Sequence, residues 1–212
     1  MNPVHAQADL FGQAALYSSA AHAVADLVGT IPSDRWDGPG LGDWDLRALV
    51  GHTSRALLTV ETYLQRPAER EDLATAAAYV AAGQRLAADA GGGVAQRGRD
   101  AGEALGPRPA EAFAAIVYRV LPQCERADDP VITTIAGGMR LSIYLETRTF
   151  ELVVHGVDIA DALGVAPPAF GFEVWRAALE LAAAVAVLTD EAPALLRALT
   201  GRAALPPGYS IV

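Results

Sequence analysis

The segment RTFELVVHGVDIADALG, residues 148–164, combines many apolar residues with four side chains that could do chemistry. As an α-helix it stacks Arg148, Glu151, His155 and Asp158 on one side, because they lie three, four and three residues apart. A carboxylate and an imidazole four residues apart on one helical face can bind a divalent metal ion. The alternative is an ion pair between Glu151 and Arg148, with His155 half-buried and hydrogen-bonded elsewhere.

A second histidine, His52, lies in DWDLRALVGHTSRALLTV, residues 43–60, on the apolar face of another expected helix. A histidine on such a face needs a polar partner. The partner could be a backbone carbonyl, or His52 could join Glu151 and His155. Two imidazoles and one carboxylate are the ligands of open catalytic zinc sites, and nickel, iron and manganese are also compatible with them. Asp158 could then accept a hydrogen bond from a ligand imidazole, or lie on a solvated surface.

The elements that must position these residues are expected to be helices. The Gly-rich segment 91–109 is predicted to be a mobile loop, and the segment 131–142 a short pair of strands or an ordered loop. We expect Asp43 to cap the second helix. Apolar periodicity and Gly/Pro breaks predict helices over residues 8–29, 43–64, 69–90, 110–126, 141–163, 170–188 and 192–200.

Long amphipathic helices with little strand predict an all-α fold. We expect a helical bundle in residues 1–165. Residues 166–212 are expected to form a helical extension that packs on the outside of this bundle.

Composition narrows the possible functions. The chain has 212 residues and a net charge of -9, and its arginines are scattered, which argues against nucleic-acid partners. No apolar run reaches membrane-spanning length and the start lacks an export signal, so we expect a cytoplasmic protein. The single cysteine, Cys124, has no histidine beside it and is expected to be a buried, unactivated thiol. All 16 basic residues are arginine, which indicates a GC-rich genome.

The segments DWDLRALVGH, residues 43–52, and RTFELVVHGVDIADALG resemble the mycothiol-dependent maleylpyruvate isomerase family. This family is part of the DinB-like four-helix metalloprotein superfamily, and the resemblance covers about residues 5–165. The family pattern is a histidine on the second helix and Glu-x-x-x-His near the end of the fourth, with an arginine before and an aspartate after. The resemblance implies a DinB-like bundle in which the metal ligands are His52, Glu151 and His155.

The resemblance also implies the cosubstrate, which is mycothiol, a low-molecular-weight thiol of GC-rich actinobacteria. Arg148 and Arg202 are the residues expected to hold this thiol. Arg202, in LLRALTGR, is also expected to take part in catalysis with Asp158 by gripping a carboxylate of thiol or substrate, although it could be a solvated arginine at a helix end. The isomerase itself carries a larger mixed α/β C-terminal domain, so the substrate stays open.

Three functions fit these residues. The first is a metal-dependent enzyme, with zinc as the expected metal, that activates mycothiol for attack on a small electrophile and gives thiol transfer or cis-trans isomerisation. The second is a hydrolase that uses bound water, with Asp158 or Tyr144 assisting proton movement. The third is a non-catalytic, metal-stabilised binding module whose partner helix is residues 170–188. No nucleic acid or membrane partner is expected, and the chain is a monomer or a homodimer.

Overall fold

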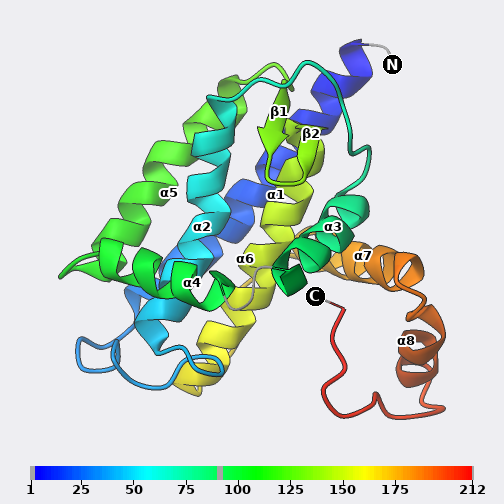
Figure 1. Cartoon of the computed structure of the whole chain (residues 1–212). Coiled ribbons are helices and arrows are strands. Elements are labelled where there is room, and N and C mark those ends of the chain that lie inside the picture. Colours follow the sequence, from blue (N-terminus) through cyan, green and yellow to red (C-terminus); the bar gives the residue numbers. More distant parts are fainter. Residues whose placement is uncertain (1–2, 90–92, 212) are drawn as a thin grey trace.

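The computed structural model describes the backbone of residues 3–89 and 93–211 and the side chains of residues 10–86 and 93–211 (Figure 1). The described chain forms helices and one small sheet. The helices are α1 (Pro3–Gly29), α2 (Leu46–Leu64), α3 (Ala76–Asp89), α4 (Gly93–Ala104), α5 (Pro109–Arg126), α6 (Leu141–Leu163), α7 (Phe172–Leu188) and α8 (Ala192–Leu199), and the strands are β1 (Val131–Thr134) and β2 (Gly137–Arg140).

Four helices form the bundle. Helix α6 packs against α1 and α2, and α5 packs against the same two helices from the other side, which gives the cyclic order α1, α6, α2, α5. The shared core is apolar and contains fully buried side chains from each of the four helices, such as Tyr17, Leu49, Phe113 and Leu152. The expected all-α architecture, a DinB-like four-helix bundle with additional C-terminal helices, is confirmed.

The additional helices lie around this bundle. Helix α4 packs on α2, whereas α7 packs on α6 and α3 and is followed by α8, away from the bundle (Figure 1). Within residues 3–89 and 93–211, no helix combines the length and apolar character that crossing a bilayer requires.

Helix α6, which carries Glu151 and His155, has the predicted bounds. It ends at Gly164, whose φ of 71° is left-handed and whose N–H donates to the carbonyl groups of Ala160 and Asp161. Helix α2 begins later than expected, because Asp45 rather than Asp43 is its N-cap. The Asp45 carboxylate accepts a hydrogen bond from the Ala48 N–H at 2.7 Å.

The predicted helix over residues 69–90 is wrong at its start, because α3 begins only at Ala76. The preceding residues pair with the hairpin instead. The N–H of Ala68 donates to the Val131 carbonyl at 2.9 Å, and that of Asp72 to the Gly138 carbonyl at 2.7 Å. Strands β1 and β2 are antiparallel, with Val131 opposite Arg140. The predicted pair of strands is therefore confirmed, and it holds the connection from α2 to α3 in an extended form.

The predicted loop over residues 91–109 is also wrong, because residues 93–104 form α4; residues 91 and 92 lie outside the described chain. Two glycines of α4 allow close packing. A Cβ atom at Gly98 would lie 2.7 Å from the indole of Trp44, and one at Gly102 would lie 2.8 Å from the carbonyl oxygen of Arg47. The glycines therefore permit contact with α2 and the turn before it, and they do not mark a flexible loop.

Candidate metal centre

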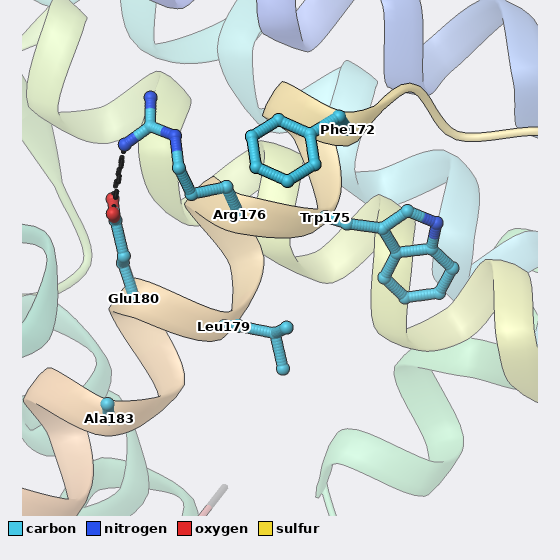
Figure 2. A pocket seen from close by; sticks show the side chains of 6 residues that line it. All are labelled: Phe172, Trp175, Arg176, Leu179, Glu180 and Ala183. Carbon is cyan, nitrogen blue, oxygen red and sulfur yellow. Dashed lines mark hydrogen bonds and ion pairs between the residues drawn. The ribbon is translucent and has the colours of Figure 1, made fainter.

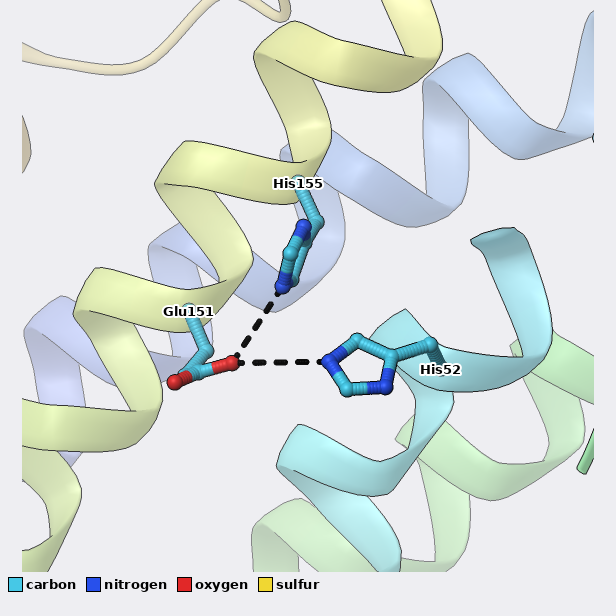
Figure 3. A group of neighbouring side chains, drawn as sticks. All are labelled: His52, Glu151 and His155. Atoms are coloured by element: carbon cyan, nitrogen blue, oxygen red, sulfur yellow. Dashed lines mark ion pairs between the residues drawn. The ribbon is translucent and has the colours of Figure 1, made fainter. Parts of the chain in front are cut away.

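Helices α2 and α6 bring His52, Glu151 and His155 together, half-buried between the two helices (Figure 3). Each of the three offers one ligand atom, and these atoms all lie within 4.8 Å of one another. The Oε2 atom of Glu151 is 3.3 Å from Nε2 of His155 and 3.9 Å from Nε2 of His52. The three residues that the sequence singles out as metal ligands are thus neighbours, although they come from distant parts of the chain.

The orientation of His155 is set by Asp158, one turn further along α6. The Nδ1 atom of His155 lies 3.0 Å from Oδ2 of Asp158. An ionised carboxylate only accepts hydrogen bonds, so Nδ1–H is the donor. This tautomer directs the other nitrogen, Nε2, toward Glu151.

The imidazole of His52 is braced by an aromatic ring. Its centroid is 4.7 Å from that of Trp44, with an angle of 33° between the ring planes. The indole N–H of Trp44 donates to the carbonyl of Ala95 at 2.9 Å, which ties the ring to α4. The Nδ1 atom of His52 is buried and has no hydrogen-bond partner among the residues that the structure describes. The contact with the Trp44 ring therefore orients the imidazole of His52, as the hydrogen bond to Asp158 orients that of His155.

Burial and neighbouring charges set the ionisation of the three groups. The pKa of His52 is lowered to about 4, mainly by burial and also by the charge of the nearby His155. Burial opposes the charged forms of His155 and Glu151 as well, but the groups around them together outweigh it. Hydrogen bonds to Asp158 and then to Glu151 raise the pKa of His155 to about 9, and the hydrogen bond to His155 and the charge of Arg148 lower the pKa of Glu151 to about 2.

These donors fit a divalent cation. The carboxylate of Glu151 carries a negative charge and His52 is neutral, so two acceptor groups converge on one point. Asp158 accepts the Nδ1 proton of His155, and the raised pKa of His155 puts a second proton on Nε2 at neutral pH, where it faces Glu151; a cation bound here would replace that proton. Lone pairs directed at one another require a proton or a cation between them. Two imidazole nitrogens and one carboxylate oxygen are a ligand set of open zinc sites.

Arg148 lies beside Glu151 on α6, near the carboxylate oxygen that the two histidines do not approach. Its guanidinium is buried over the ring of Tyr144, 4.8 Å from the centroid, and 5.6 Å from that of Tyr79. Its Nη2 atom is 3.9 Å from Oε1 of Glu151, and its Nε donates to the hydroxyl of Thr147 at 3.0 Å. Arg148 therefore faces one carboxylate oxygen of Glu151, while the histidines face the other.

The remaining residues that the sequence singles out lie elsewhere. Arg202 follows α8, is exposed, and donates from Nη1 to the Thr200 carbonyl at 2.9 Å. Among the described side chains, no hydrogen bond or ion pair joins it to the cluster. The Tyr144 hydroxyl donates to that of Thr59 at 2.7 Å, and burial raises its pKa well above the ordinary value. Cys124 is buried on α5 and burial raises its pKa to about 12, which confirms an unactivated thiol.

The sequence does not single out Trp44 as a support for His52. This contact depends on α4, whose carbonyl and glycine fix the indole, and the high glycine content of that segment predicts a loop. The only local signal is the position of Trp44 directly before the Asp45 cap of α2.

The chain was compared with family models, with curated proteins and with solved structures, and one of these comparisons gave a match. A family model described as the mycothiol maleylpyruvate isomerase N-terminal domain matches residues 17–160, a range that contains His52, Glu151 and His155. No curated protein and no solved structure matched in the other two comparisons. Since the match covers more than half of the chain, the protein belongs to the mycothiol maleylpyruvate isomerase N-terminal domain family.

Proposed function

We propose that the protein is a metal-dependent enzyme that uses mycothiol to attack a small electrophilic substrate. The observation that carries this proposal is the convergence of His52, Glu151 and His155 within 4.8 Å. Family membership supplies the thiol, because the matching family is described by mycothiol. The family also relates the chain to isomerases, and thiol transfer needs the same activated sulfur.

In this proposal His52, Glu151 and His155 hold the cation, with zinc as the first expectation. A divalent cation bound there would supply Lewis acidity that keeps a coordinated sulfur in its thiolate form at neutral pH. The protein supplies orientation. Asp158 keeps the Nε2 lone pair of His155 toward the site, and Arg148 faces the carboxylate oxygen of Glu151 that the histidines do not use.

The chain itself supports an external nucleophile. Its only cysteine, Cys124, lies on α5 with Sγ 3.8 Å from the Val120 carbonyl, and its raised pKa keeps it as a thiol at neutral pH. The hydrolase alternative needs the same cation with water in place of the thiol; of its two candidate proton carriers, Tyr144 is hydrogen-bonded to Thr59 and Asp158 to His155.

Three further assignments remain proposals. Arg148 and Arg202 are proposed to contact the thiol. Asp158 and Arg202 are proposed to take part in catalysis. For Arg202, the sequence alone supports these roles. Residues 1–165 are proposed to be the metal-binding unit and residues 166–212 its helical extension.

The test measures metal content and thiol binding in the same samples. We expect about one equivalent of divalent metal in the purified protein, the stoichiometry of a single His₂Glu site. Isothermal titration of this metal-loaded protein with mycothiol should show binding, and His155→Ala should lose both the metal and the binding. Cys124→Ala is the control, because a buried thiol that takes no part in chemistry can be replaced without loss of thiol binding.

Two results would contradict the proposal. Equal metal content in His155→Ala and the unchanged protein would reject the metal site. Retained metal without mycothiol binding would reject thiol chemistry and leave hydrolysis or a structural role for the metal.

A further inference from the structure

Helix α7 is apolar on two opposite faces. One face is buried against α6 and α3, and it carries Val174, Ala178, Leu181 and Val185. The opposite face carries four apolar residues at helical spacing, which we call the outer stripe: Phe172, Leu179, Ala183 and Val187. A surface helix normally has one apolar face, and a helix that is apolar all round is normally buried on all sides.

The outer stripe is open to solvent. Phe172 is 77% exposed, and Leu179 and Val187 are each 65% exposed. No described part of the chain covers these side chains. Helix α8, which follows directly, adds Leu196 and Leu199, which are also mostly exposed. Contiguous exposed apolar surface of this kind marks an interaction site in soluble proteins.

The outer stripe has both a projection and a hollow (Figure 2). Phe172 stands at one end of a hollow of about 380 Å³ that extends along the helix past Leu179 to Ala183. Charged residues line one edge. Arg176 donates to Glu173 at 2.6 Å and to Glu180 at 2.9 Å. One edge of the stripe therefore presents both signs of charge within two turns of helix.

We propose that the outer stripe is a homodimer interface, in which it packs against the same stripe of a second copy with the two α7 helices antiparallel. In a two-fold interface, residue i of one copy meets residue j of the other and the reverse contact repeats. An axis that passes near residue 178 places Phe172 over the small side chain of Ala183 in the partner. The same axis places Arg176 of each copy opposite Glu180 of the other.

Area and charge support a second copy as the occupant. A phenylalanine side chain presents about 150–250 Å², so Phe172 alone leaves roughly 150 Å² in water. With Leu179 and Val187 the exposed area of the stripe is several hundred Å², a large part of the about 800 Å² per partner that a standard interface buries. The edge of mixed sign complements itself across a two-fold axis. This edge has two glutamates and one arginine, so its net negative charge does not favour binding to an anionic membrane surface.

The first test is sedimentation velocity of the full chain over a wide range of concentration. The unchanged protein should be a dimer, and Leu179→Asp should weaken dimerisation at least tenfold because it places charge at the centre of the interface. Phe172→Ser should have the same effect and serves as a second variant if Leu179→Asp folds poorly, as judged by circular dichroism. Tyr118→Asp is the matched control, because Tyr118 is 84% exposed on α5, away from α7.

Two results would overturn the proposal. The first is a monomer at every concentration of the unchanged protein. The second is a dimer that the well-folded variants Leu179→Asp and Phe172→Ser leave intact.

The second test addresses the antiparallel register. Arg176→Glu and Glu180→Arg each place like charges opposite one another across the proposed axis, and each should weaken the dimer at least tenfold. The double variant Arg176→Glu/Glu180→Arg exchanges the signs and should restore most of the affinity. Thermal unfolding of each variant separates this effect from loss of the contact within one helix. A double variant that dimerises no better than either single variant would reject the register.

Discussion

The two imidazoles of the cluster are held in different ways. His155 donates its Nδ1 proton to Asp158, so its Nε2 is directed at the site by a hydrogen bond. His52 has a buried Nδ1 without a described partner, and a buried polar group left in this state costs about 1–3 kcal/mol. The stacked ring of Trp44 limits the rotation of His52. Orientation at this site therefore depends on one carboxylate and one indole outside the three clustered residues.

Replacing Asp158 tests the hydrogen-bonded half of this arrangement. Asp158→Asn removes the charged acceptor of the His155 Nδ1–H, so the imidazole becomes less basic and less well oriented. We expect metal affinity to fall about 10–100-fold, as for other partners of ligand histidines. Competition with a chromogenic chelator measures this change. Asp161→Asn is the control, because Asp161 is exposed on the same helix; equal affinities of the two variants would contradict the role of Asp158.

Much of the cluster is predictable from the sequence because helical spacing is rigid. The spacing of Glu151, His155 and Asp158 fixes their common face before any tertiary contact is known. The meeting with His52 follows from bundle packing and from the family pattern. The support from Trp44 does not, because it depends on a helix that the sequence predicts as a loop.

At the scale of helices and loops, glycine is the residue type whose structural role is hardest to predict from the sequence. The same residue type loosens a loop or lets two backbones approach, and only tertiary contacts distinguish the two cases. In α4 it allows the approach, since Gly102 packs against the backbone of α2 next to Gly51. The late start of α3 has a related cause, because residues 68–72 pair with the hairpin and this pairing overrides their helical tendency.

The glycine contact between α2 and α4 gives an element-scale prediction. A Cβ atom at Gly51 would collide with the backbone of Gly102. Gly51→Ala should therefore force α4 away from α2 and lower the free energy of unfolding by about 1–3 kcal/mol, the usual cost of overpacking. Urea unfolding measures the loss.

The matched control is Gly12→Ala in α1. A Cβ atom there would meet nothing within 4 Å, so the change should be neutral or stabilise by up to about 1 kcal/mol through helix propensity. If the two variants had the same effect, helix propensity rather than the close approach of α4 would govern Gly51. Loss of metal affinity in Gly51→Ala would in addition show that α4 holds Trp44 on His52.

For the whole molecule, the site couples two helices that are far apart in the sequence. His52 comes from α2, and Glu151 and His155 come from α6, and these helices pack against each other through the core. A ligand that binds only when both helices are in place binds the folded chain and not the unfolded one. Metal binding at this site is therefore linked to global stability.

This linkage gives the whole-molecule prediction. At a free metal concentration of about one hundred times Kd, binding should raise the free energy of unfolding by about 2.7 kcal/mol. For a chain of this size, each kcal/mol raises Tm by about 2–4 °C, so thermal unfolding with and without zinc should differ by several degrees. His52→Ala removes one ligand and should abolish most of this shift.

His22→Ala is the control for that measurement. His22 is an exposed histidine of α1 with Asp26 one turn further on, and its Nδ1 is hydrogen-bonded to the Ser18 carbonyl at 2.8 Å. It thus has an imidazole and a carboxylate one turn apart, in the reverse order to Glu151 and His155, and among the described residues no third ligand from another helix joins them. We expect its removal to leave the zinc-dependent shift unchanged. A shift that disappears in His22→Ala but persists in His52→Ala would place the metal on α1 and not between α2 and α6.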